Sequence, residues 1–140
     1  MTSVVIGNCG FGCAPCRPDM RERAMKTMER TEAAPYDAQK RGMPWDWESF
    51  PEFLDSVDRT PKGVNICSFL GIVPLMTHVM GLENAKKRGA TKEEMDEMKR
   101  LLREGMEAGA CGIAWEPASR CKTAKPETPP YAHLHTHGQT

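Results

Sequence analysis

Short apolar runs alternate along this chain with longer stretches whose apolar positions follow helical spacing. The β-branched run at residues 3–7 predicts a buried strand, and the apolar runs at residues 64–70 and 110–115 predict two more. The stretches between them predict helices at residues 19–30, 45–58, 74–80, 82–88 and 92–108. This order is typical of a parallel sheet, so we expect an α/β fold with about three parallel strands and flanking helices.

The helix expected at residues 92–108 carries the clearest boundary signals. Thr91 and Glu94 have the spacing of a capping box, and Gly109 is suited to end the helix. Its apolar stripe predicts a face packed in the core, formed by Met95, Met98, Leu101, Leu102 and Met106. By contrast, prolines and a glycine interrupt residues 31–44, and we expect that segment to be irregular.

The domain organisation follows from length and from a change in composition. The chain has 140 residues, which fits one ordinary domain. Residues 122–130 contain three prolines and show no apolar period. We therefore expect a folded unit over residues 1–118 and a poorly ordered tail over residues 119–140.

Charge and cysteine usage narrow the partners and the compartment. Nineteen basic and nineteen acidic residues balance, so nothing in the charge favours nucleic acid or an anionic membrane as a partner. No apolar run approaches the roughly 20 residues of a membrane span. Six cysteines without a visible secretory signal indicate reduced thiols, and we expect a cytoplasmic protein.

Cys9 is the residue best placed for chemistry. It follows the first predicted strand and is bracketed by Gly7 and Gly10, which allow a tight turn. The carboxyl ends of strands are where α/β proteins usually carry their active sites. The alternative is that Cys9 is a buried small hydrophobic residue beside a turn, and the spacing alone leaves both interpretations open.

Two other thiol patterns overlap this segment. Cys9, Cys13 and Cys16 have the spacing C-x3-C-x2-C, which could hold an iron–sulfur cluster of the kind found in radical enzymes. Pro15 departs from that pattern, because those enzymes usually carry an aromatic residue there. Cys13 and Cys16 alone could form a redox dithiol, although no helix N-terminus clearly lowers their pKa.

The remaining candidates are histidines and carboxylates. Three alternating histidines near the C-terminus could bind zinc, or could be a flexible tail with nonspecific metal affinity: His133, His135 and His137. His78 lies in an apolar helical stretch and is expected to be packed rather than a ligand. A group of carboxylates could serve acid–base chemistry, but their spacing favours the solvated face of a helix: Asp46, Glu48, Glu52 and Asp55.

Taken together, several segments resemble the N-acyl-D-amino-acid deacylase (D-aminoacylase) branch of the amidohydrolase superfamily. They are residues 5–11, 42–55, 61–66, 79–83 and 104–112. The resemblance implies a zinc-dependent (β/α)8 TIM barrel, of which this chain would be a partial fragment. It also implies hydrolysis of a linear amide C–N bond in a small N-acyl amino acid-like substrate. In that family the cysteine of the Gly-Asn-Cys-Gly motif binds metal, so the resemblance makes Cys9 a zinc ligand.

This sequence departs from the family pattern in ways that shape the expectation. The His-x-His pair that precedes the cysteine in the family is absent, and Ile72 and Met76 stand where the family has histidine and arginine. A complete barrel needs roughly 200 residues or more. We therefore expect an internal piece of a larger hydrolase, silent by itself, whose partner is the remainder of the barrel. The alternative is a catalytically inactive interaction module.

Overall fold

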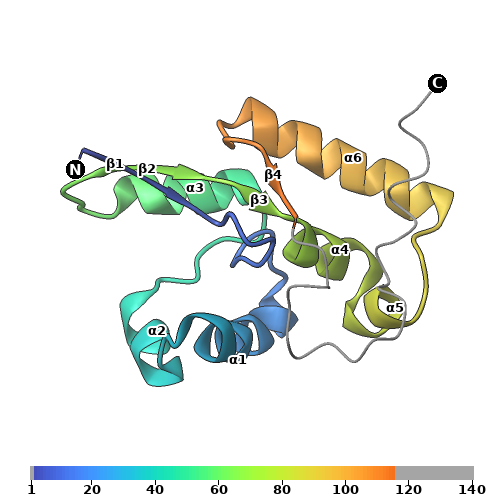
Figure 1. The fold of residues 1–140 in the computed structure, drawn as a ribbon, viewed down its shortest axis with the longest axis horizontal. Coiled ribbons are helices and arrows are strands. Elements are labelled where there is room, and N and C mark those ends of the chain that lie inside the picture. Colours follow the sequence, from blue (N-terminus) through green and yellow to red (C-terminus); the bar gives the residue numbers. More distant parts are fainter. Residues whose placement is uncertain (1, 116–140) are drawn as a thin grey trace.

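The computed structural model of this chain describes residues 2–115, which contain two short pairs of parallel strands (Figure 1). Strand β1 (Ser3–Ile6) pairs with β2 (Asn65–Ser68), and β3 (Leu70–Gly71) pairs with β4 (Ile113–Ala114). The expected α/β arrangement with parallel strands is confirmed, but the first strand is not buried as expected, since Val5 and Ile6 are exposed. The predicted tail at residues 119–140 lies outside the described residues.

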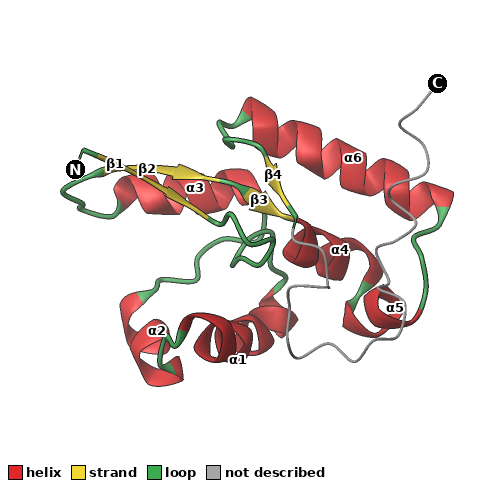
Figure 2. Ribbon diagram, viewed as in Figure 1, coloured by secondary structure: helices red, strands yellow, loops and turns green. Residues whose placement is uncertain are grey.

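Between β1 and β4, the described residues form seven helical segments (Figure 2). They are η1 (Pro18–Met20), α1 (Arg21–Glu32), α2 (Tyr36–Gly42), α3 (Phe50–Arg59), α4 (Ile72–Met80), α5 (Leu82–Lys87) and α6 (Lys92–Glu107). The helices expected near residues 19–30, 74–80, 82–88 and 92–108 are confirmed, with shifts of one or two residues at their ends. Within residues 2–115, no helix has the length and apolar character needed to cross a bilayer.

The expectation of an irregular segment at residues 31–44 is wrong, because α2 forms there. Its polar sequence gives little helical signal, and a tertiary contact stabilises it instead. The buried side-chain amide of Gln39 donates hydrogen bonds to the carbonyls of Met25 (3.0 Å) and Ala34 (2.7 Å). The amide therefore fastens α2 to α1, and the two helices pack as a pair (Figure 1).

The helix expected to begin at Trp45 begins at Phe50. Ser49 caps it: its hydroxyl accepts a hydrogen bond from the Glu52 backbone, and the Glu52 carboxylate accepts one from the Ser49 backbone. Trp45 has a positive φ of 49°, which is incompatible with a helical turn. Trp45 and Trp47 are instead buried side chains that stack on each other, with ring centroids 5.1 Å apart.

The strand expected at residues 64–70 is split at Phe69 because its two halves pair with different neighbours. The Phe69 N–H donates to the carbonyl of Ile6 (3.0 Å), whereas the Leu70 N–H donates to that of Gly112 (2.9 Å). The third expected strand, at residues 110–115, is shortened to two residues. Gly112, with a φ of 152°, breaks the extended conformation just before it.

The core is centred on Leu70, whose side chain is 0% exposed. A Cβ placed on Gly105 of α6 would lie 2.8 Å from Leu70 Cδ1 and 3.4 Å from the ring of Phe50. The glycine therefore lets α6 approach both β3 and α3 closely. Most of the predicted stripe on α6 faces this core, but Met106 is 45% exposed and does not belong to it.

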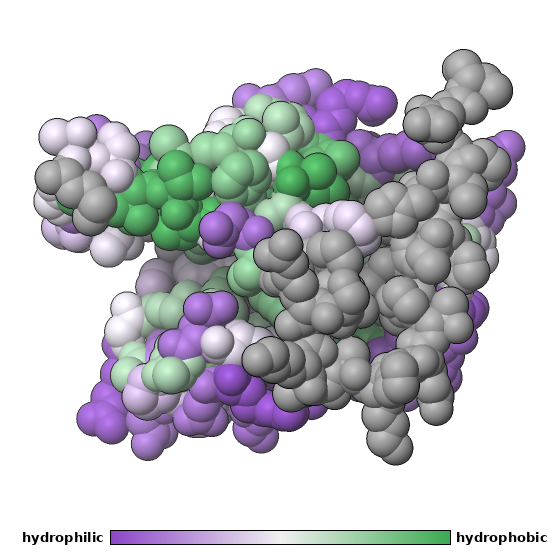
Figure 3. Space-filling model, viewed as in Figure 1, coloured by the Kyte–Doolittle hydropathy of each residue, from purple (hydrophilic) through white to green (hydrophobic). Residues whose placement is uncertain are grey.

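One face of the molecule exposes apolar side chains along the strands (Figure 3). Among the described residues, the exposed large hydrophobic side chains include Val5, Ile6, Ile113 and Trp115. Within residues 2–115, β1 and β4 each pair with a single neighbouring strand. Strands with one neighbour present unpaired backbone groups along their outer edges.

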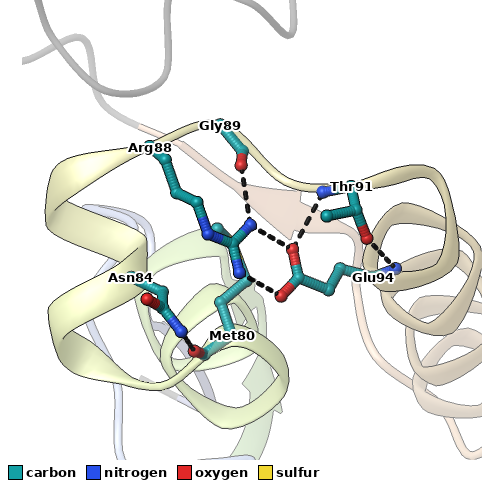
Figure 4. Close-up of polar contacts among 6 residues, drawn as sticks. All are labelled: Met80, Asn84, Arg88, Gly89, Thr91 and Glu94. Atoms are coloured by element: carbon teal, nitrogen blue, oxygen red, sulfur yellow. Dashed lines mark hydrogen bonds and ion pairs between the residues drawn. The ribbon is translucent and has the colours of Figure 1, made fainter.

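An ion pair joins the end of α5 to the start of α6 (Figure 4). The Arg88 guanidinium donates to both carboxylate oxygens of Glu94, at 2.7 and 2.6 Å. The same carboxylate accepts a hydrogen bond from the Thr91 backbone (2.8 Å), and the Thr91 hydroxyl accepts one from the Glu94 backbone (3.3 Å). The predicted capping box of Thr91 and Glu94 is confirmed, and Arg88 extends it.

We expect the Glu94 contacts to make the free energy of unfolding depend on pH. The hydrogen bond from Arg88, and next the one from the Thr91 backbone, lower the pKa of Glu94 from 4.5 to about 2. The contribution is therefore present above pH 4.5 and is lost as the pH falls towards 2. Urea unfolding should show Glu94→Gln as less stable than the unmodified chain at neutral pH, with a difference that shrinks in acid.

The matching test of this contact is the Arg88→Gln variant, alone and combined with Glu94→Gln. Since the two side chains act as one pair, the double variant should lose little more stability at neutral pH than either single variant. Additive losses of stability in the double variant would contradict this account. A stability difference between Glu94→Gln and the unmodified chain that stays constant down to acid pH would also contradict it.

Candidate functional site

Cys9 lies in the turn that directly follows β1. Gly7 and Gly10 have φ values of 80° and 84°, so the two glycines expected to shape this turn adopt the left-handed conformation. The Cys9 thiol is half-buried. It is therefore not sealed in the hydrophobic interior, and the interpretation of Cys9 as a packed core residue does not fit the structure.

The turn that carries Cys9 is fixed against β3 and the start of α4. The Val73 N–H donates to the Gly10 carbonyl at 3.0 Å. A Cβ placed on Gly71 would lie 2.7 Å from the Gly10 carbonyl oxygen and 2.9 Å from that of Phe11. This close backbone approach positions the Cys9 turn at the edge where the parallel strands β1 and β2 both end.

Glu32 is the titratable side chain that the structure brings to Cys9. The Cys9 thiol donates to Glu32 Oε1 across 3.9 Å, a long contact made possible because α1 ends beside the turn. Sequence reasoning missed Glu32, since no spacing rule connects it to a cysteine in another element. A thiol and a carboxylate are both potential ligands for a divalent metal ion.

These side chains do not make a complete metal site by themselves. Within residues 2–115, no group of three or more His, Cys, Asp or Glu side chains is arranged to hold a metal ion. Protein zinc sites use three or four such ligands. The described residues can therefore supply one thiolate ligand, with a carboxylate nearby, but not the full set of ligands of a zinc site.

Cys13 and Cys16 do not join Cys9 in a cluster. Cys16 is buried and Cys13 is half-buried, and burial is the main cause that raises the pKa of each thiol to about 11. The Trp47 indole N–H donates to the Cys13 carbonyl (2.8 Å), and the Cys16 N–H donates to the Glu48 carbonyl (2.7 Å). The iron–sulfur interpretation thus finds no converging thiols, and the dithiol lacks thiolate character at neutral pH.

The other candidate side chains behave as the packing and surface interpretations predict. His78 is half-buried on α4, and burial lowers the pKa of its imidazole. The carboxylates of Asp46, Glu48, Glu52 and Asp55 are exposed; Asp46 pairs with Arg59 at 2.7 Å, and Glu52 belongs to the cap of α3. His133, His135 and His137 lie outside the described residues.

Comparison with known proteins identifies relatives but no matching family model. The chain is 33% identical over 127 residues to a D-aminoacylase from Alcaligenes xylosoxydans xylosoxydans, a match covering 88% of this chain and 23% of the relative. An N-acyl-D-aspartate deacylase from the same organism is 30% identical with the same coverage. An uncharacterised protein of Mycobacterium tuberculosis is 30% identical over 118 residues, covering 81% of this chain and 19% of that protein.

Solved structures give the same answer. A crystal structure of D-aminoacylase, described as defining a novel subset of amidohydrolases, matches with a TM-score of 0.56 and 28% identity, over 80% of this chain and 21% of that chain. Another D-aminoacylase structure, from work on its binuclear metal centre, matches with a TM-score of 0.55. The chain thus spans about a fifth of the length of the relatives it matches. It belongs to the D-aminoacylase branch of the amidohydrolases and corresponds to one segment of such a protein.

Proposed function

We propose that this chain is the segment of a zinc-dependent amidohydrolase that supplies one metal ligand, the thiolate of Cys9. The enzyme that contains such a segment hydrolyses the linear amide C–N bond of an N-acyl amino acid. The observation that carries the proposal is the position of Cys9: an accessible thiol at the carboxyl end of a parallel strand, in a segment related to D-aminoacylase.

In this proposal, zinc supplies the chemistry, whereas this chain supplies one ligand and holds that ligand in place. Bound zinc polarises a carbonyl group and activates water for attack on an amide. Cys9 holds its sulfur at the strand edge, and the glycine turn together with its contact to Gly71 fixes where that sulfur lies. Because the described residues contain no group of three ligands, the other ligands and the proton-transfer carboxylate come from segments outside residues 2–115.

The proposal also says what would cover the exposed apolar face, namely the remaining strands of the barrel. A (β/α)8 barrel continues its parallel sheet past β1 and past β4, and its further strands would cover the side chains of Val5, Ile6 and Ile113. Two observations support this interpretation: within residues 2–115 each strand pairs with a single neighbour, and the chain spans only part of its relatives' length. The partner is therefore the remainder of the barrel, not a nucleic acid or a membrane.

A segment exchange tests the proposal. Residues 3–115 of this chain replace the matching segment of a D-aminoacylase, and bound zinc per chain and hydrolysis of an N-acetyl-D-amino acid are measured. We expect the hybrid to bind zinc and to hydrolyse the substrate. Cys9→Ala should weaken zinc binding by about 100-fold or more, since even residues that only support a ligand contribute 10–100-fold.

The control variant is Cys111→Ala, which removes an exposed thiol distant from the Cys9 turn in sequence and should leave zinc binding unchanged. The 140-residue chain alone should show no hydrolysis. A hybrid that folds and binds zinc equally well with alanine at position 9 would refute the role of Cys9. If the isolated chain hydrolysed the substrate and Cys9→Ala abolished that activity, the claim that its metal site is incomplete would be refuted.

A further inference from the structure

Two cysteines far apart in the sequence meet where β2 passes into β3. Cys67 lies on β2, and Cys111 lies in the turn between α6 and β4. The Cys111 N–H donates to the carbonyl of Ser68 at 2.9 Å, so its backbone lies beside the residue that follows Cys67. The next link of the same ladder is the 2.9 Å hydrogen bond from Leu70 to Gly112, which begins the pairing of β3 with β4 (Figure 1).

The two thiols are in contact and accessible. The Cys67 and Cys111 side chains interact, and, after desolvation, this interaction is the next cause that raises the pKa of the Cys111 thiol. Both cysteines are free thiols, with Cys111 exposed and Cys67 half-buried. A reagent in solution can therefore reach Cys111 first, and Cys67 lies within reach of the sulfur that has reacted.

Glycines on either side of Cys111 permit this approach. Gly109 and Gly112 have φ values of 112° and 152°, in the region that favours glycine. A Cβ placed on Gly112 would lie 3.1 Å from the Phe69 ring, so the backbone beside Cys111 packs closely against that side chain. The two glycines thus allow the turn that brings Cys111 beside β2.

We propose that Cys67 and Cys111 form a reversible disulfide by exchange with a low-molecular-weight disulfide such as glutathione disulfide. In its deprotonated form, which alkaline pH favours, Cys111 attacks one sulfur of the small disulfide, whose S–S bond breaks and releases the first small thiol. Cys67 then attacks the Cys111 sulfur, and the mixed disulfide releases the second small thiol. The two protein thiols lose two electrons, the small disulfide gains them, and the protons leave on the small thiols.

The cross-link would tie β2 to the segment leading into β4. It would reinforce the backbone hydrogen bond from Cys111 to Ser68, and it would close the chain between Cys67 and Cys111 into a loop that contains α4, α5 and α6. A disulfide restricts the unfolded chain more than the folded one. We therefore expect the oxidised chain to unfold at a higher temperature than the reduced chain. This inference does not depend on the proposed metal site.

Peptide mapping of the full chain tests the proposal directly. The reduced chain is incubated with glutathione disulfide, its remaining thiols are blocked, and it is digested with trypsin without reduction. Cys67 falls in the peptide of residues 63–86 and Cys111 in that of residues 104–120, and each peptide contains a single cysteine. We expect these two peptides to be joined, at a mass lower by two hydrogen atoms than their sum, and to separate on reduction.

Three variants serve as controls. Cys67→Ser should stop at glutathione attached to Cys111, and Cys111→Ser should lose the cross-link, whereas Cys9→Ser should form it as the unmodified chain does. The oxidant-dependent rise in unfolding temperature should disappear in the first two variants and persist in the third. Glutathione held on Cys111 in the unmodified chain, a link between Cys13 and Cys16 in its place, or no reaction at position 67 would overturn the proposal.

Discussion

Replacing Gly71 with alanine is expected to cost about 3 kcal/mol or more of folding stability, at the upper end of what overpacking a core costs. The new methyl group would lie 2.7 Å from the Gly10 carbonyl oxygen and 2.9 Å from that of Phe11. Both are backbone atoms, so no side-chain rotation relieves the clash. The turn that carries Cys9 would have to move away from β3, and the 3.0 Å hydrogen bond from Val73 to Gly10 would be lost with it.

The matched control for Gly71→Ala is Gly63→Ala, because a Cβ at Gly63 has no atom within 4 Å. Urea unfolding followed by circular dichroism measures both variants. We expect Gly63→Ala to stay close to the unmodified chain, or to be slightly more stable because alanine restricts the unfolded state. Faster labelling of Cys9 by a thiol reagent should accompany the loss in Gly71→Ala. Equal unfolding midpoints for the two variants would contradict the close-approach argument.

The second large effect is expected at Trp47, where alanine should cost about 3–5 kcal/mol, the usual range for removing a buried aromatic side chain. Trp47 is 3% exposed, stacks on Trp45, and meets the edge of Phe53 at a centroid distance of 5.2 Å. Its indole N–H donates to the Cys13 carbonyl at 2.8 Å. The side chain therefore joins the segment before α3 to the cysteine-containing loop after β1.

Trp47→Phe separates the two contributions of this side chain. Phenylalanine keeps most of the aromatic contact but removes the N–H, so the Cys13 carbonyl loses this donor at a cost of about 1–3 kcal/mol. Unfolding midpoints should therefore fall in the order unmodified chain, Trp47→Phe, Trp47→Ala. A phenylalanine variant as unstable as the alanine variant would assign the whole effect to the hydrogen bond. A phenylalanine variant without loss would assign it to packing.

The element pattern was largely readable from the sequence, and its failures have physical causes. The capping box at Thr91 was predicted because its signal is local, within four residues, whereas the one at Ser49 was missed and that helix was expected to begin at Trp45. Helix α2 was missed because a buried amide from Gln39 to neighbouring backbone stabilises it, not an apolar stripe. The split of the second strand at Phe69 was missed because it reflects which neighbour pairs with which half, a long-range property.

The candidate site, too, could be predicted only in part from the sequence. The glycines around Cys9 predict a turn at a strand end, and the structure has it, with a half-buried thiol. Glu32 beside Cys9, and Cys111 beside Cys67, could not be predicted, because each pair is brought together by packing between elements distant in sequence. The spacing of Cys9, Cys13 and Cys16 left a cluster open as an alternative, but burial of Cys16 in the core separates its role from that of Cys9.

From its residues alone, this chain could be assigned parallel α/β character, most of its helices, its kinship with D-aminoacylase, and a turn after the first strand that carries Cys9. These features depend on residue types and spacings within single elements, where backbone geometry fixes the relation between neighbours. The packing of distant elements determines which thiols are accessible, which carboxylate lies beside Cys9, and which cysteines are in contact. Those relations depend on strand register and on close contacts at Gly71, Gly105 and Gly112, which pair residues that no local rule connects.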